Sequence, residues 1–219
     1  MPEPISIQDF HDGAAGWRVF HDGGATAYST GTFEAGARLV QALGGIRAGP
    51  DQHLDVDLRR DRVTVRLITR TEDFFGLTRA DVDVANRISQ VAHDLGFEED
   101  PSDVQTVQVS IDAEAIAEVM PFWRAVLGYE FRDSDMEDVW DPRGRGAPFW
   151  FQEMDEPRPQ RNRIHVDVSV ATNEIARSRV EAALAAGGHV VTDRFAPMWW
   201  TLADSEGNEV DVTSLEARA

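Results

Sequence analysis

The sequence predicts an α+β protein with two domains, because two different patterns of helices and strands follow one another along its 219 residues. In the first half, helix patterns alternate with pairs of strand patterns, which favours an antiparallel sheet with helices on one face. In the second half, a strand–helix–strand–strand–strand unit occurs twice, which predicts an internally duplicated domain. We place the domains at 1–97 and 105–219, and a linker at 98–104, where an acidic run contains a proline.

The first half begins with a short helix that Ser6 can cap, followed by a hairpin around the turn HDGG at 21–24. A second helix is predicted at 33–46 and ends at two glycines. The spacing of its apolar residues predicts a buried face made of Phe33, Ala37, Val40 and Leu43.

Two alternating strands follow at 53–59 and 63–69, joined by a tight turn at 60–62. Their predicted inward residues are Leu54, Val56, Leu58, Val63, Val65 and Leu67, and their predicted outward residues are His53, Asp55, Asp57, Arg66 and Arg70. Thr78 and Asp81 then form a capping-box pattern at the start of a third helix. The apolar stripe of that helix is Val82, Ala85, Ile88, Ala92 and Leu95.

The second half contains the repeat. Residues 107–128 and 164–188 each run from an alternating strand into a helix, and the spacing from Gln108 to Leu127 equals that from His165 to Leu184. Shorter strand candidates follow each copy, at 129–133, 138–142 and 148–154 in the first and at 189–193, 198–204 and 208–214 in the second. Strand alternation predicts that Gln108 and His165 face a cleft, away from the helices.

Composition excludes several classes of function. The net charge of −18 leaves neither half with a basic face for nucleic acid. All 21 basic residues are arginine, which excludes a Schiff-base or P-loop lysine, and the absence of cysteine excludes thiol enzymes and zinc–thiolate sites. The N-terminus has no signal-peptide pattern and no stretch is apolar enough to span a membrane, so we expect a cytoplasmic protein.

The first half resembles the pterin-4a-carbinolamine dehydratase family. The resemblance covers residues 5–97 and rests on Gly16-Trp17-Arg18, the FEAGARLV helix, the hairpin QHLDVDLRRDRVTVRLITR and the motif GLTRAD. Members of that family carry His-His-Pro where this chain has Gln52-His53-Leu54, and many have a further histidine where this chain has Arg70. The resemblance therefore implies a pterin site in which only His53 is retained.

Loss of a carbinolamine hydroxyl requires one proton to be given and another to be removed, and groups that titrate near neutrality do both best. His53 is the candidate catalytic residue, with Asp55, Asp57 or Asp81 orienting its ring. Gln52 and Arg70 are candidate ligand-binding residues, but neither exchanges a proton at neutral pH. The alternative is that His53 belongs to a solvated strand face of acids paired with arginines. We favour the solvated face or an impaired site over an intact pterin site.

The second half resembles the vicinal oxygen chelate superfamily, which includes glyoxalase I, ring-cleaving dioxygenases and bleomycin-resistance proteins, and is nearest to the glyoxalase-like branch. The resemblance covers 105–215 and rests on the duplication, the helix end PFWRAVLGY and the turn LADSEGNEVDV. In that superfamily the first and last strands of each repeat supply ligands to a divalent metal. The resemblance places these at Gln108, Gln152, His165 and Asp211.

Two interpretations of this cleft remain open. One divalent ion of the hard or borderline type suits a histidine, a carboxylate and two amides, although amides bind metals weakly. In the other, no metal binds and His165 contacts a ligand or a neighbouring side chain. Glu209, Trp150 and Trp200 are candidate ligand-binding residues in either case, with Trp199 as a further aromatic candidate.

These patterns predict a protein that acts on a small polar organic molecule, by lyase-type chemistry at His53 or by a glyoxalase-like reaction at His165 and Asp211. The alternative is a binding protein that sequesters its ligand, as bleomycin-resistance proteins do, with the first domain used for assembly. A homo-oligomer is expected from both resemblances and from strand edges that need cover. No nucleic-acid or membrane partner is expected.

Overall fold

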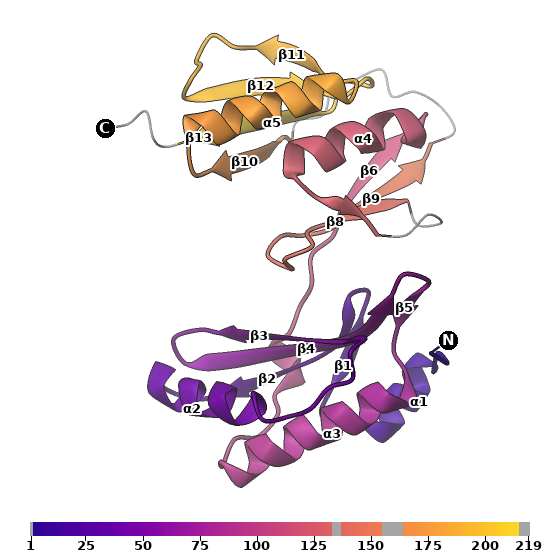
Figure 1. Cartoon of the computed structure of the whole chain (residues 1–219), viewed down its shortest axis with the longest axis vertical. Coiled ribbons are helices and arrows are strands. Elements are labelled where there is room, and N and C mark those ends of the chain that lie inside the picture. Colours follow the sequence, from indigo (N-terminus) through magenta and orange to yellow (C-terminus); the bar gives the residue numbers. More distant parts are fainter. Residues whose placement is uncertain (1, 133–136, 155–163, 215–219) are drawn as a thin grey trace. The chain divides into compact units, whose positions relative to one another are not determined.

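The computed structural model describes residues 2–132, 137–154 and 164–214 (Figure 1). The chain divides into two compact units, residues 1–106 and 107–219. Each unit has its own hydrophobic core, one around Trp17, Tyr28 and Leu39 and the other around Phe122, Trp123 and Phe151. No helix in the described part of the chain is long and apolar enough to cross a lipid bilayer.

The first unit is an antiparallel sheet with its helices on one face, as predicted (Figure 1). The strands lie in the order β1-β2-β4-β3, and β5 pairs with β4. The helices are α1 (Ile7–Gly13), α2 (Phe33–Leu43), α3 (Arg79–Asp94) and the short η1 (Pro101–Asp103). The strands are β1 (Arg18–Phe20), β2 (Gly23–Ser29), β3 (Gln52–Leu58), β4 (Arg62–Thr71) and β5 (Phe74–Gly76).

The predicted apolar face of α2 is correct at Val40 and Leu43, which pack against the core, and wrong at Phe33 and Ala37, which are exposed. Phe33 is 58% exposed, whereas Leu39 and Leu43 are buried and Gly36 faces the sheet. A Cβ on Gly36 would lie 2.5 Å from Leu58 Cδ1, so the missing side chain allows the helix to approach the sheet closely. Leu95 is likewise 45% exposed, because it caps the C-terminus of α3 and no longer lies on its buried stripe.

Residues 98–104, expected as a linker, pack against the first unit. The Asp100 N–H donates to the Ala27 carbonyl, and Glu99 forms a β-bridge with Tyr28. Further along, Arg66 donates to the carbonyl of Gln105. The segment therefore lies beside β2 at Ala27 and Tyr28, which β1 does not cover, before the second unit begins.

The second unit consists of two copies of one strand–helix–strand–strand–strand module. The first contains β6 (Val109–Ala113), α4 (Ile116–Leu127), β7 (Glu130–Phe131), β8 (Asp138–Trp140) and β9 (Phe149–Glu153). The second contains β10 (Val166–Val170), α5 (Asn173–Ala185), β11 (His189–Thr192), β12 (Trp199–Ala203) and β13 (Glu209–Ser214). Asp133, in the strand candidate 129–133, lies outside the described residues.

The two modules share one topology. The sheet orders are β6-β9-β8-β7 and β10-β13-β12-β11, and in each the first strand pairs parallel to the last. Helices α4 and α5 cover the core faces and pack against each other. The predicted duplication and fold class are therefore confirmed, and the face of each sheet away from the helices is called the open face below.

The turn before the last strand of each module is built around a buried aspartate. Asp141 accepts hydrogen bonds from the N–H groups of Arg143 and Arg145, and Asp204 accepts them from Glu206 and Asn208. Gly144 and Gly207 follow at the same distance with φ of +62° and +86°, which favours glycine. The sequence DPRGRG at 141–146 thus forms a second copy of the turn at 204–208, although its residues resemble those of that turn only at the aspartate and the glycine.

The turn of the first module also contains an ion pair, between Asp141 and Arg145. Burial opposes the charge on Asp141 and is the largest single influence on its pKa. The side chain of Arg145 and the two backbone N–H groups outweigh it and hold the pKa below its usual value. A lowered folded-state pKa stabilises the fold above the unfolded-state value, and this contribution is lost as pH falls through the lowered pKa.

Asp204 also joins the two modules. Its Oδ2 accepts a hydrogen bond of 2.9 Å from the indole N–H of Trp123 on α4, and both side chains are buried. Two residues later, Glu206 accepts the backbone N–H groups of Glu114 and Ala115 at the start of the same helix. The turn of the second module therefore caps the helix of the first.

We predict that Asp204→Ala lowers the free energy of unfolding by about 3 kcal/mol, because it leaves the buried Trp123 N–H and two backbone N–H groups without an acceptor. Urea denaturation followed by tryptophan fluorescence measures the change. Ser205→Ala, in the exposed part of the same turn, is the control and is expected to change stability by less than about 0.5 kcal/mol. Equal midpoints for the two variants would contradict this prediction.

Candidate functional site

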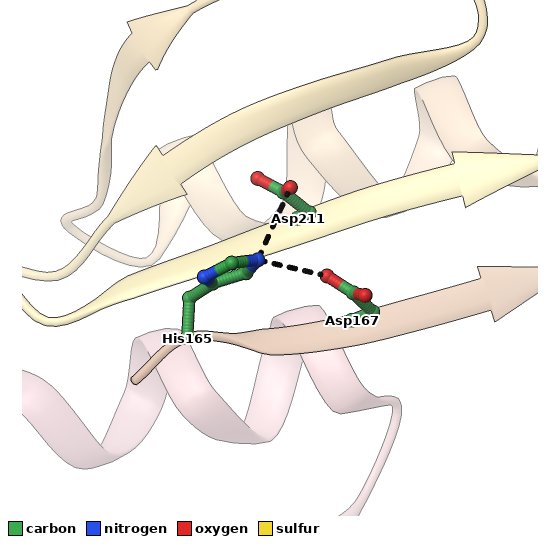
Figure 2. A group of neighbouring side chains, drawn as sticks. All are labelled: His165, Asp167 and Asp211. Atoms are coloured by element: carbon green, nitrogen blue, oxygen red, sulfur yellow. Dashed lines mark ion pairs between the residues drawn. The ribbon is translucent and has the colours of Figure 1, made fainter. Parts of the chain in front are cut away.

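Three ionisable side chains converge on the open face of the second module (Figure 2). His165 immediately precedes β10, Asp167 lies on β10, and Asp211 lies on the neighbouring strand β13. The parallel register places Asp167 opposite Asp211, while the adjacent pair Val166 and Val210 faces the core. Alternation along two paired strands thus brings all three polar side chains to one face.

The donor atoms of these residues lie close together. His165 Nε2 is 3.4 Å from Asp167 Oδ1 and 3.7 Å from Asp211 Oδ2. One ligand atom from each residue lies within 4.8 Å of the others. His165 is 51% exposed and Asp211 only 20%, so the group is open to solvent on one side and rests against the sheet on the other.

Asp211 has an oxygen that the described residues leave unsatisfied. Its Oδ1 atom is buried and has no hydrogen-bond partner in the described part of the chain. A buried carboxylate oxygen without a donor costs free energy unless a cation, a ligand or water satisfies it. The residues present therefore fit a divalent cation, which one imidazole and two carboxylates can hold.

Asp167 was not among the residues proposed from the sequence. The same parity argument that placed His165 on the open face applies two residues later, and it would have found Asp167. Glu209, a proposed ligand-binding residue, faces the same side next to His165 when the register is extended by one residue. It lies outside the group of three converging donors.

The first module places different side chains at the equivalent positions. The pair Val109–Phe149 corresponds to Val166–Val210. Gln108, Ser110 and Trp150 therefore take the positions of His165, Asp167 and Asp211. Gln152, proposed as a metal ligand, lies two residues beyond the position equivalent to Asp211 and pairs with Asp112.

The aromatic candidates separate into two groups. Trp150 is 37% exposed and lies on the open face beside Ser110. Trp200 pairs with Val212 and packs against the core. The register therefore turns it away from His165, Asp167 and Asp211, called the His–Asp–Asp group below. Trp199, one residue earlier, faces the open side and stacks on Phe195 with ring centroids 4.3 Å apart.

In the first unit, the candidate residues lie on opposite faces of the sheet. His53 pairs with Ile68 on the face away from the helices, whereas Gln52 pairs with Thr69 on the helix side. Gln52 donates to Asp81, which also accepts from Thr69 and from the N–H of Thr78. Asp81 is fully buried, so its role is to cap α3 and tie it to the sheet.

The remaining candidates share the face of His53. Asp55 lies opposite Arg66, but the ion pair of Arg66 is with Asp22, at 2.9 Å. Asp57 pairs with Arg59 instead of with the next strand. Arg70 lies opposite Phe75 on β5. Of the three acids proposed to orient His53, only Asp55 and Asp57 share its face.

Comparison with known families agrees with this division of the chain. Residues 3–91 match the family model described as pterin 4 alpha carbinolamine dehydratase, and residues 108–213 match the one described as a glyoxalase-like domain. The chain carries a pterin-4a-carbinolamine dehydratase domain and a glyoxalase-like domain. The His–Asp–Asp group and both aspartate turns belong to the glyoxalase-like domain. No curated protein matches the chain.

Several solved structures are similar to about half of the chain. A hypothetical protein from S. aureus has 16% identity and a TM-score of 0.42, with 51% of this chain and 94% of that chain covered. A glyoxalase/bleomycin resistance protein/dioxygenase family enzyme from Burkholderia phytofirmans has 17% identity and a TM-score of 0.39, with 49% and 95% covered. A fosfomycin resistance protein from Mesorhizobium loti has 9% identity and a TM-score of 0.38, with 50% and 90% covered.

We predict that the dehydratase domain turns over a pterin 4a-carbinolamine at least about 100-fold more slowly than a protein with the full histidine set. Gln52 faces away from His53 and Arg70 exchanges no proton, so general acid–base contributions of this size are lost. A stopped-flow assay of the full chain measures the rate. Ordinary turnover that His53→Ala abolishes would show the site to be intact.

Proposed function

We propose that the glyoxalase-like domain is the main functional part of the chain, and that it binds a small polar organic molecule beside a divalent cation held at His165 and Asp211. The observation that carries this proposal is the convergence of these side chains on the open face, with Asp211 Oδ1 buried and lacking a partner among the described residues. A cation would satisfy that oxygen, and the exposed side of the group would remain accessible to a ligand.

The side chains of the site have distinct roles in this proposal. Asp211 is mostly buried and anchored on a central strand, so it fixes the position of the cation. His165 is more exposed and its Nε2 faces both carboxylates, which hold the imidazole ring in place. A bound divalent ion would act as a Lewis acid on an oxygen of the ligand. The chemistry supported is a lyase-type or glyoxalase-like reaction of an oxygen-rich substrate.

A second candidate function is sequestration without catalysis. It is supported by the stacked pair Phe195 and Trp199, which presents aromatic surface on the same module as the His–Asp–Asp group. Phe195 is 39% exposed. A planar ligand could stack there without reacting. Steady-state turnover of candidate substrates, compared with ligand affinity measured by tryptophan quenching, separates the two functions.

In this proposal the protein acts in the cytoplasm, and the dehydratase domain serves mainly in assembly and contributes little to catalysis. Its buried polar network of Gln52, Thr69, Thr78 and Asp81 is fully occupied in holding α3 against the sheet. We also propose that the protein forms a homo-oligomer, which light scattering at micromolar concentration tests.

We predict that the full chain binds Mn²⁺ and that His165→Ala weakens binding by about 100-fold or more, because one of few protein ligands is removed. Isothermal titration calorimetry or the EPR signal of free Mn²⁺ measures the affinity.

The control for this experiment is His189→Ala, which removes an exposed histidine from β11 of the same module. His53→Ala serves as a second control in the other domain. Both are expected to bind Mn²⁺ as the unmodified chain does. If the unmodified chain binds no divalent cation at any pH, the cation part of the proposal is wrong.

A further inference from the structure

We propose that the cation is held by the second module alone, with Asp167 as its third ligand, and that the first module contributes aromatic surface in place of ligands. This inference rests on the proposed function of the glyoxalase-like domain. It differs from the four-ligand set expected from the resemblance, in which Gln108 and Gln152 of the first module complete the site.

The first step of the argument is the strand register. Asp167 and Asp211 are direct partners across β10 and β13, and His165 lies two residues before Asp167 on the same face. Side chains at positions i and i+2 of one strand point the same way, and direct partners on neighbouring strands lie about 5 Å apart. The three donors are therefore brought together by one sheet, whatever the first module contributes.

The second step is the distance between donors. Metal–ligand bonds of ~2.0–2.2 Å place two donors of one ion ~3 Å apart at a right angle and at most ~4.4 Å apart across the ion. The observed 3.4 Å and 3.7 Å from His165 Nε2 lie within that range, and the largest separation in the group is at most 4.8 Å. His165 therefore already lies at a spacing from both carboxylates that one shared ion requires.

The third step is charge. Two carboxylates and a neutral imidazole balance a divalent cation, whereas one carboxylate with amides leaves a net charge of +1. Carboxylates are strong ligands for hard divalent ions, and amides are weak ones. Asp167 therefore supplies the second negative charge, which Gln108 and Gln152 of the first module lack. The site favours Mn²⁺ or Mg²⁺, which prefer oxygen ligands.

The fourth step is the divergence of the first module. At the positions equivalent to the three ligands it has Gln108, Ser110 and Trp150, none of which carries a charge. Trp150 stands where Asp211 stands in the second module, and a third of its surface is exposed. An indole there cannot bind a metal through its ring nitrogen, because that N–H donates hydrogen bonds and has no free lone pair for a metal. It provides a flat apolar surface for a ligand.

Titration of Mn²⁺ into the full chain tests this assignment. Asp167→Asn is expected to weaken Mn²⁺ binding by about tenfold or more, while Gln108→Ala and Gln152→Ala change it by less than about twofold. Asp193→Asn removes the same charge from an exposed turn of the same module and controls for general electrostatic attraction. Circular dichroism without metal verifies that Asp167→Asn is folded, as its exposed position predicts.

The outcomes separate the two proposals. Binding that survives Asp167→Asn unchanged, or that is lost in Gln108→Ala or Gln152→Ala, overturns the single-module assignment while leaving a cation site in the domain. Equal loss in Asp167→Asn and Asp193→Asn overturns it as well, because the effect is then one of net charge. Absence of binding by the unmodified chain overturns the proposed cation site itself, and this assignment with it.

Discussion

The buried carboxylate of Asp204 is the interaction on which the geometry of the glyoxalase-like domain depends. It closes the turn between β12 and β13, and it accepts the indole N–H of Trp123 from the helix of the other module. A tight turn of fixed length sets the register of the strand that follows it. Because Asp211 lies on β13, the same interaction decides that its side chain reaches the open face, beside Asp167.

The duplicated module has kept its framework and changed its open face. Asp141 and Asp204 build the same turn, and the parallel pairing of first and last strands is the same in both copies. On the open face, however, one copy presents His165 and two aspartates while the other presents a glutamine, a serine and Trp150. Core residues are constrained by packing density, whereas open-face residues are free to diverge because their changes cost little stability. Two copies of one fold can therefore carry different parts of one site.

Much of the fold was predictable because alternation along a strand is a local property of the sequence. It identified the inward residues of β3 and β4, the duplication, and the open-face position of His165, whereas Asp211 was placed by the family resemblance. Sequence patterns were insufficient where three-dimensional contacts decide. The face of α2 is set by the close approach at Gly36, and the position of Gln152 relative to Asp211 is set by pairing across the sheet. Trp199 and Trp200 are neighbours that point opposite ways, so only the register shows which one faces the open side.

In the dehydratase domain, too, the role of a residue depends on which face of the sheet it occupies, as Gln52 shows. Gln52 and His53 are adjacent, as the two histidines of the resembled motif are, and adjacent strand residues point to opposite faces. The structure uses Gln52 on the helix side, where its amide completes the hydrogen bonds of the buried Asp81. An amide satisfies a buried carboxylate without a proton to exchange, which suits a structural role and not an acid–base one. Gln52 stands where the resembled family has a histidine, and this same residue joins β3 to the start of α3. This domain therefore keeps its fold through residues that no longer match the catalytic pattern.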